Sequence, residues 1–366
     1  MNHYTISKVD LWPVDIPLTD PFVVATGSRV VAHNAFVRVT LKSGAHGYGE
    51  IAPFPEVGGE DRDASLLVAS RLAKAALGHP ATHYKKLSRL FMEMAAPHPA
   101  ARCGIETALL DALCRELQIP LWGLWGGADV RDRQTDITIP ITDVNQTLAL
   151  AQGWYSRGFR LFKTKVGADV EQDIRRLDAL HRTFPHVAFI ADGNQGFTRE
   201  ECLHLVKEVR QSGANIVLLE QPVAREDLES MAALRRDTSI PVAADESCRS
   251  LEDTRDILRA EAADFINIKI MKAGLFEAMD IAALARATGL RLMIGGMVET
   301  RTAMGCSFSL ALGTGGYEIL DLDTPLLMAT DPVRGGYQYA GPTLQPWSGA
   351  GLDLEPEEAA QVTTIE

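Results

Sequence analysis

The sequence predicts an α/β protein in which a (β/α)7β barrel of the TIM type follows an α+β capping domain. The chain of 366 residues is 46% hydrophobic, which is enough for one large or two smaller cores. Strand patterns precede helix patterns in its first part, and short β-rich runs alternate with amphipathic helices from about Thr135 onward. We therefore expect the capping domain at 1–125 and the barrel at 126–323, with part of the tail, 324–366, packing on the cap.

The capping domain begins with segments in which apolar and polar residues alternate, as in half-buried strands. Helical periodicity follows these segments. The sequence pattern then changes near LWGGADVRDR to alternating β-rich runs and helices, and we take this segment as the boundary between the two domains. The expected strands are 4–16, 34–41 and 47–52, and the expected helices are 63–77 and 100–117.

Eight short β-rich runs make up the barrel prediction. The charged or glycine-marked ends of successive runs lie 24 to 28 residues apart, which suits one strand, one crossover helix and two short loops. A solenoid would also be periodic, but its units would share a repeat motif, and these share only the order of elements. The runs are 135–141, 161–166, 186–192, 215–220, 240–245, 264–270, 290–296 and 318–323.

Composition limits the classes of partner. The formal net charge is −12 and the chain has no basic run, so nothing in it attracts nucleic acid or an anionic membrane surface. No apolar stretch has the length of a spanning helix, and the five cysteines lack CxxC spacing. We expect a cytoplasmic protein with a small-molecule partner, and association into a homo-oligomer stays open.

Three successive barrel strands end in an acid: Asp192, Glu220 and Asp245. An acid after a strand is often only a helix N-cap or a turn residue. In a barrel, however, the carboxyl ends of the strands meet at one mouth, so three such charges would repel one another unless a cation lay between them. Ligands that are all oxygen favour Mg²⁺, with Mn²⁺ as the alternative, over Zn²⁺.

Lysines mark the second and sixth strands. Lys163 and Lys165 point to one face because strand side chains alternate, and we expect their ammonium groups to lower each other's pKa. Lys269 ends the sixth strand; a lysine at a strand end can also extend to solvent. Strands two and six are four apart in a ring of eight, so Lys165 and Lys269 should face each other across the mouth.

This arrangement suits removal of a proton α to a carboxylate. The charge that develops on the carboxylate oxygens is stabilised by a divalent cation, as in enolase-superfamily sites that combine a lysine base with Mg²⁺. If Lys165 or Lys269 takes the proton and the other returns it on the opposite face, the enediolate becomes the epimer. Lys163 would help to neutralise the carboxylate.

Asp321 and Asp323 lie on one face near the end of the last strand. An aspartate before Thr-Pro is common in turns. In a mouth that already holds a metal, two further acids need a cationic partner, and a substrate ammonium group would be one.

The motifs KTK, IADGNQG, LLEQP, AADES and INIKIMKAG resemble those of the muconate lactonising enzyme branch of the enolase superfamily, over nearly the whole chain. The resemblance implies Mg²⁺ on Asp192, Glu220 and Asp245, with Lys165 and Lys269 as the acid/base pair. The segment DLDTPLL is similar to that of dipeptide epimerases, which implies that Asp321 and Asp323 bind the amino terminus of a dipeptide and that Thr138 lies beside it.

The specificity positions depart from two known patterns in that family. Gly27 stands where the L-Ala-D/L-Glu epimerases carry an arginine, and Val298 stands where cation-selective relatives place an acid. We therefore expect an L-Ala-L-Xaa substrate whose second residue is uncharged, small or apolar. Thr26 and Gly27 of the capping loop, Phe54 within EIAPFPEVGGED, and Met297 beside Val298 should contact it.

Other readings of the residues remain. An N-acylamino acid racemase or an o-succinylbenzoate synthase would use the same metal and lysines, but its substrate has no free ammonium group, so Asp321 and Asp323 speak against it. Cycloisomerisation of muconate is a weaker alternative still. A third alternative is a non-catalytic barrel that serves as a binding or structural protein. Such a protein would not need to retain all five metal and lysine positions.

Overall fold

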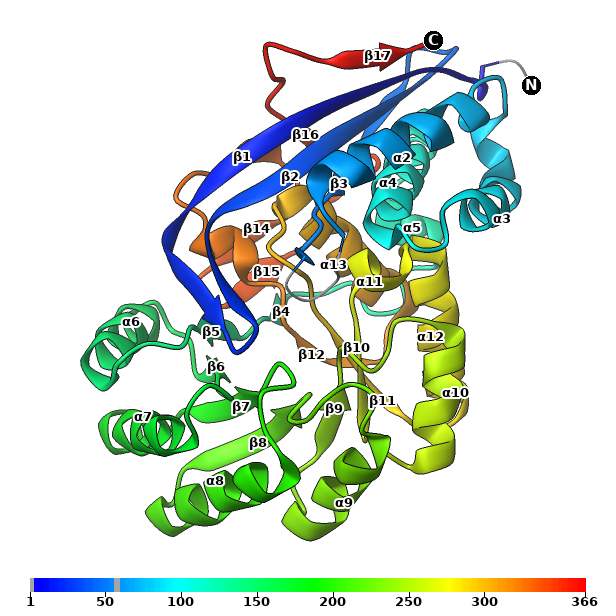
Figure 1. Cartoon of the computed structure of the whole chain (residues 1–366). Coiled ribbons are helices and arrows are strands. Elements are labelled where there is room, and N and C mark those ends of the chain that lie inside the picture. Colours follow the sequence, from blue (N-terminus) through cyan, green and yellow to red (C-terminus); the bar gives the residue numbers. More distant parts are fainter. Residues whose placement is uncertain (1–2, 56–59) are drawn as a thin grey trace.

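The computed structural model describes residues 3–55 and 60–366. Part of the EIAPFPEVGGED segment, residues 56–59, lies outside the described residues. The chain forms a capping domain, with two long strands, a shorter one and several helices, above a barrel (Figure 1).

The cap sheet is antiparallel, with strand order β17-β1-β2-β3. β1 (Ile6–Val24) pairs with β2 (Gly27–Leu41) along most of its length, and β2 pairs with β3 (His46–Ile51). Near the C-terminus, β17 (Thr363–Ile365) returns to the outer edge of β1. The two ends of the chain therefore meet in one sheet (Figure 1).

One cap helix, α4 (Pro99–Leu117), is buried along almost its whole length and packs on β3. Glycine makes this close approach feasible: a Cβ at Gly47 would lie 2.0 Å from the backbone nitrogen of Ala112, and one at Gly49 would lie 2.0 Å from the carbonyl oxygen of Gly104. The other cap helices among the described residues are α2 (Arg62–Ala76), η1 (Ala81–His83), α3 (Tyr84–Ala95) and α5 (Leu121–Leu124).

The barrel sheet has eight parallel strands in sequential order, and its two ends are joined because the backbone nitrogen of Asp136 donates to the carbonyl oxygen of Leu320 at 3.1 Å. The predicted fold class is confirmed. The strands are β5 (Ile137–Ile139), β6 (Leu161–Lys165), β7 (Ala188–Asp192), β8 (Asn215–Glu220), β9 (Val242–Ala244), β10 (Phe265–Ile268), β11 (Arg291–Ile294) and β12 (Tyr317–Leu320).

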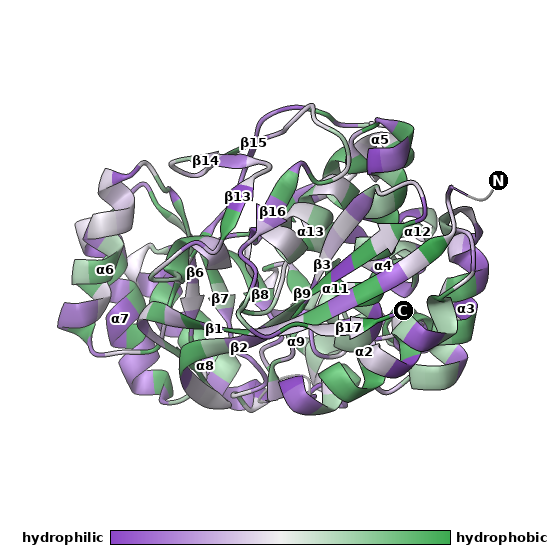
Figure 2. Cartoon of the chain, turned by 90° about the horizontal axis from the view of Figure 1, so that it is seen from above, coloured by the Kyte–Doolittle hydropathy of each residue, from purple (hydrophilic) through white to green (hydrophobic). Residues whose placement is uncertain are grey.

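Helices connect these strands on the outside, and most begin at a side chain that accepts a hydrogen bond from the first turn, as an N-cap does. These caps are Asp143, Asp169, Thr198, Asp227, Ser250 and Thr300. The helices are α6 (Val144–Ser156), α7 (Val170–Thr183), α8 (Arg199–Ser212), α9 (Leu228–Thr238), α10 (Leu251–Ala260), α11 (Ile270–Ala273), α12 (Leu275–Ala287) and α13 (Arg301–Thr314). Hydrophilic and hydrophobic residues are mixed on the outer helices α3, α6 and α7 (Figure 2).

The barrel interior is filled by apolar side chains below its mouth. Ile190, Leu218, Ala243, Phe265 and Met293 form a cluster of their own, each at most 1% exposed. Because this cluster closes the barrel from below, polar side chains on the same faces of the strands gather at the carboxyl ends.

The chain after β12 runs outside the barrel. η2 (Thr324–Leu327) follows directly, and short strands then form two small antiparallel sheets. These strands are β13 (Val333–Gly335) with β16 (Leu354–Pro356), and β14 (Gln338–Ala340), β15 (Thr343–Gln345) and β4 (Arg133–Gln134). Among the described residues, no helix combines the length and the hydropathy needed to cross a bilayer.

The tip of the β1–β2 hairpin reaches down to the mouth of the barrel (Figure 1). The backbone nitrogen of Ile141 donates to the carbonyl oxygen of Val23 at 3.1 Å. The loops after β6 and β7 are close to the hairpin as well: a Cβ at Gly196 would lie 2.8 Å from the Cβ of Ala25. The cap therefore covers the carboxyl ends of the strands.

Candidate active site

Two lysines of β6 point into the mouth, and both are at most 4% exposed. The Lys163 ammonium lies 2.6 Å from Asp321 Oδ2 and 3.0 Å from both Glu220 Oε1 and Asp192 Oδ2. The Lys165 ammonium lies 2.7 Å from the same Asp192 oxygen. Lys163 thus joins acids from three strands of the mouth.

The prediction that these two lysines lower each other's pKa is wrong for Lys163. Burial lowers its pKa, but the carboxylates of Asp321, Glu220 and Asp192 more than offset this and hold it well above the usual value. Lys163 is therefore a charged residue in the free protein.

On the opposite side of the mouth, Lys269 follows β10 and its ammonium lies 2.7 Å from Asp245 Oδ2. Lys272, one turn later in α11, lies 2.5 Å from Asp245 Oδ1. Although burial raises the pKa of the Asp245 carboxyl, these two ammonium groups hold it well below its usual range. The pKa of Asp192 is lowered to about 2, against the effect of burial, chiefly by Lys165 and Lys163.

Glu220 is the least compensated acid of this set. Its Oε1 accepts from the Asn267 amide at 2.8 Å, while its Oε2 is buried without a hydrogen-bond partner. Burial, together with the nearby Asp192 carboxylate, raises the pKa of Glu220 to about 8. An orphaned buried carboxylate oxygen beside two further acids fits a divalent cation that binds oxygen ligands. Asp192, Glu220 and Asp245 could therefore hold one.

Asp321 and Asp323 lie together with a third acid that the sequence analysis missed, Asp136. One oxygen from each of the three falls within 4.8 Å of the others. Among the described residues, these three acids are close enough together to share a metal ion. The predicted metal ligands Asp192, Glu220 and Asp245 each form an ion pair with a lysine instead. Asp136 precedes β5 and shares the inward face of Thr138, so alternation along TDITIPI could have identified it.

This carboxylate corner, which we define as Asp136, Asp321 and Asp323, is short of partners. Both oxygens of Asp136 and Oδ1 of Asp323 are buried without a hydrogen bond. Asp323 Oδ2 accepts from the backbone nitrogen of Thr138 at 2.6 Å. Burial and the neighbouring Asp321 raise the pKa of Asp323 to about 6 and hold that of Asp136 well above its usual value. The corner can accept a cation.

A small cavity of about 30 Å³ lies between the two lysines. Lys165 and Lys269 line it together with Asn194 and Gly296. Its remaining walls are apolar and come from both domains: Phe22, Val24, Phe54, Met297 and Val298. The cavity holds about one water molecule, so a larger ligand requires these side chains to move.

Three of the predicted specificity residues, Phe54, Met297 and Val298, lie at this cavity. Thr26 and Gly27 do not line it: they stand at the hairpin turn, and Phe22 and Val24 of the same hairpin face the lysines instead. That Thr26 and Gly27 contact the substrate therefore stays a prediction, whereas Phe22 and Val24 line the cavity between the lysines.

Further buried polar residues support the site. Gln221 Oε1 accepts from the backbone nitrogens of Asp245 and Ser247 at 3.0 and 2.9 Å, which fixes the loop after β9. Glu299 accepts from the backbone nitrogen of Met297 at 2.7 Å, and burial raises its pKa to about 8. Gln221 follows Glu220 in LLEQP, so the motif itself marked it; nothing in the sequence pattern marked Glu299.

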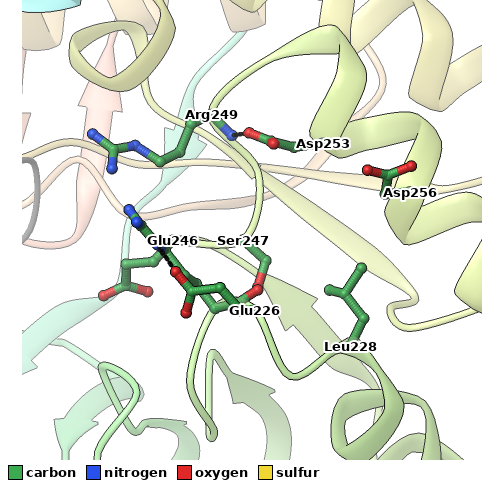
Figure 3. A pocket seen from close by; sticks show the side chains of 8 residues that line it. Glu226, Leu228, Glu246, Ser247, Arg249, Asp253 and Asp256 are labelled. Atoms are coloured by element: carbon green, nitrogen blue, oxygen red, sulfur yellow. Dashed lines mark hydrogen bonds and ion pairs between the residues drawn. The ribbon is translucent and has the colours of Figure 1, made fainter. Parts of the chain in front are cut away.

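A larger cavity, about 420 Å³, lies outside the mouth between the loops that follow β8 and β9. Glu246 lies on the opposite side of it from Asp253 and Asp256 (Figure 3). One ion pair in its wall joins Arg225 Nε to Glu226 Oε1 at 2.5 Å. Neither lysine of the mouth lines it, so we place the chemistry in the barrel mouth.

Two family models match the chain in the order of its domains. Residues 6–126 match the mandelate racemase / muconate lactonizing enzyme N-terminal domain. Residues 146–360 match the enolase C-terminal domain-like model.

Known relatives cover nearly the whole chain. An aromatic dipeptide epimerase from Herpetosiphon aurantiacus is 41% identical over 353 residues, 96% of this chain and 99% of that protein. The dipeptide epimerase of Enterococcus faecalis, solved with Mg and L-Leu-L-Tyr, has a TM-score of 0.92 at 30% identity and covers 96% of this chain and 99% of that one.

A relative of another specificity is more distant. An N-succinyl-L-Arg/Lys racemase from Bacillus cereus is 27% identical over 99% of this chain and 98% of that protein. The predicted resemblance is confirmed: the chain belongs to the mandelate racemase / muconate lactonizing enzyme family of the enolase superfamily.

Proposed function

We propose that the protein is a metal-dependent dipeptide epimerase that moves the α-proton of the second residue of a dipeptide. The observation that carries this proposal is that a pair of lysines and a group of acids lie next to each other in the barrel mouth. A lysine stands on each side of a cavity, and beside it lies a carboxylate corner with unpartnered oxygens.

We assign the metal to Asp192, Glu220 and Asp245, with Mg²⁺ as the ion and Mn²⁺ as its substitute. When bound, the cation supplies positive charge to the substrate carboxylate as negative charge develops there. The orphaned Oε2 of Glu220 supports this assignment.

Lys165 and Lys269 hold and move the proton at their Nζ atoms. The lysine that acts as base must be a neutral amine, and the other donates as an ammonium to the opposite face of the α-carbon. In the free protein, Asp192 and Asp245 fix the ammonium groups of Lys165 and Lys269, each through a contact of 2.7 Å. Such pairing limits the rotamers of each lysine and aims both at the same cavity.

The carboxylate corner orients the substrate. A dipeptide ammonium placed against Asp321 and Asp323 would give the unpaired Oδ1 of Asp323 a cationic partner, while the backbone N–H of Thr138 holds Asp323 Oδ2. Lys163 is already bound to Asp321 and Glu220, so it bridges the corner and the metal ligands. The distance between the bound ammonium and the reacting α-carbon of the second residue then favours a dipeptide as the substrate.

The second residue should be apolar. Phe22, Val24, Phe54, Met297 and Val298 supply the apolar walls around the lysines. None of these five residues carries a charge that could pair with an acidic or basic side chain of the substrate. The relatives named for aromatic dipeptides and solved with L-Leu-L-Tyr support the same preference.

Proton NMR in D₂O tests the proposal. Loss of the α-proton signal would be followed for L-Ala-L-Xaa dipeptides and for N-succinylamino acids, with Mg²⁺, with Mn²⁺ and with a chelator. We expect exchange that requires the metal, is restricted to free-amine dipeptides and is fastest for apolar second residues. Exchange only of the N-succinyl compounds would instead identify an N-acylamino acid racemase. Fastest exchange of L-Ala-L-Glu or L-Ala-L-Lys would overturn the preference for an apolar residue.

A further inference from the structure

A second cavity of about 200 Å³ adjoins the mouth on the side of the carboxylate corner. It lies between the β1–β2 hairpin, the end of β5, α6 and η2, and it is separate from the charged cavity outside the barrel. Two residues connect it with the active site. Phe22 lines both this cavity and the one between the lysines, and Thr138 lies in its wall.

The connection to the corner is direct. Thr138 donates its backbone N–H to Asp323 Oδ2 at 2.6 Å, and Leu326 donates its own to the carbonyl oxygen of Asp323 at 2.8 Å. Both Thr138 and Leu326 are wall residues of the cavity. In the first residue of a dipeptide, the α-carbon lies only about 1.5 Å from the ammonium nitrogen. A side chain on that carbon therefore starts at the cavity when the ammonium lies on Asp323.

The walls of the cavity are mostly apolar. Pro140, Leu150 and Trp154 form one side, and Leu326 and Leu327 form another. These side chains are half-buried, so they still offer apolar surface that a ligand could cover.

The size and the rim of the cavity narrow the class of ligand. A dry apolar cavity of about 150 Å³ in another protein holds benzene, so 200 Å³ is sufficient for a phenyl or an isobutyl group. Asp20 and Arg157 at the rim have opposite charges, and the Arg157 guanidinium lies 4.2 Å from the centre of the Trp154 ring. Neither charge sign is favoured.

We propose that this cavity binds the side chain of the first residue of the substrate, and that the protein prefers a bulky apolar first residue to alanine. The inference rests on the proposed function and deepens it. It replaces the expectation that the first residue is L-Ala.

The test compares kcat/KM for L-Leu-L-Xaa and L-Phe-L-Xaa with that for L-Ala-L-Xaa, at one fixed apolar second residue. We expect a ratio of about ten or more in the unmodified protein, the usual range for added methylene groups in an apolar pocket. Leu150→Trp should fill the cavity and bring the ratio close to one. Trp154→Ala should enlarge it and raise the ratio for a first residue of tryptophan.

Ala149→Trp is the matched control, because Ala149 is exposed on the same helix and does not line the cavity. It should leave the ratio as it is in the unmodified protein. If L-Ala-L-Xaa exchanges but the first residue makes no difference, or if Leu150→Trp and Ala149→Trp behave alike, the cavity assignment is overturned while the epimerase proposal stands. If no dipeptide exchanges, both are overturned.

Discussion

The two halves of the barrel mouth differ in how their charges are matched. On the lysine side, Asp192 and Asp245 are each within 2.7 Å of an ammonium, and their pKa values are held low in spite of burial. In the carboxylate corner, three acids lie within 4.8 Å of one another and Lys163 reaches only Asp321.

Under the proposed function, this difference separates the groups that move the proton from the groups that bind the substrate ammonium. Buried ion pairs are costly to desolvate and are retained where their geometry is needed. Buried carboxylate oxygens without a partner are also costly, and they become favourable only when a cation arrives. On the lysine side, Asp192 and Asp245 are therefore paired before the substrate binds, whereas the unpaired oxygens of the corner would gain a cation only from the substrate.

The largest expected effect is on the lysine side. Lys165→Ala and Lys269→Ala should each abolish epimerisation and lower α-proton exchange about 10²- to 10⁴-fold for one configuration of the second residue. The opposite configuration should still exchange, because the remaining lysine serves the other face. Proton NMR in D₂O with both diastereomers measures this, with thermal melting as the control for folding. Equal loss for both configurations in both variants would contradict a division between two faces.

A smaller effect is expected in the corner. Asp323→Asn keeps the shape and removes the charge, and should lower kcat/KM for free-amine dipeptides about 10- to 100-fold, since a hydrogen bond to a charged group contributes about 1.5–3 kcal/mol. Asp136→Asn is the matched control. Because burial and the neighbouring Asp321 hold the pKa of Asp136 well above its usual value and so disfavour its anion, its replacement should lower kcat/KM less than Asp323→Asn does. Similar losses in both variants would show that Asp136 also acts as an anion.

The same corner should respond to pH. Asp323, with a pKa raised to about 6, is ionised above that pH and neutral below it. An ammonium group needs the anion, so kcat/KM for free-amine dipeptides should fall as the pH drops through about 6. Asp323→Asn should lack this acid limb. A profile that is the same in the variant would assign the limb to another group.

The smallest change is expected at the hairpin turn, which belongs to neither half. Gly27→Arg should raise kcat/KM for L-Ala-L-Glu a few-fold, the effect of a partly exposed ion pair, and leave apolar dipeptides nearly unchanged. Gly27→Gln separates the effect of size from that of charge. Since Gly27 does not line the cavity between the lysines, no gain for L-Ala-L-Glu would show that the turn does not reach the second residue.

The sequence predicted the parts of the fold that follow from periodicity. All eight barrel strands were expected, and strand alternation placed Lys163 beside Lys165 correctly. The helix α3 was missed although its apolar face is well formed; its 12 residues make a shorter pattern than the 15 of α2 and the 19 of α4 on either side.

Interactions between distant segments were harder to predict. The pKa of Lys163 depends on Asp321, 158 residues away, and nearest-neighbour reasoning from Lys165 gave the wrong direction. The hairpin residues at the mouth, Phe22 and Val24, are fixed by contacts such as Val23 with Ile141, which no local pattern encodes.

The most direct test of the account removes the substrate cation alone. kcat/KM would be measured for L-Ala-L-Phe and for propanoyl-L-Phe, which has the same atoms except for the ammonium group, with Mg²⁺ at pH 8. The account predicts a loss of about 100-fold or more for propanoyl-L-Phe, because the corner then stays without its partner. Equal values for the two compounds would contradict the claim that the carboxylate corner recognises the substrate's free amine.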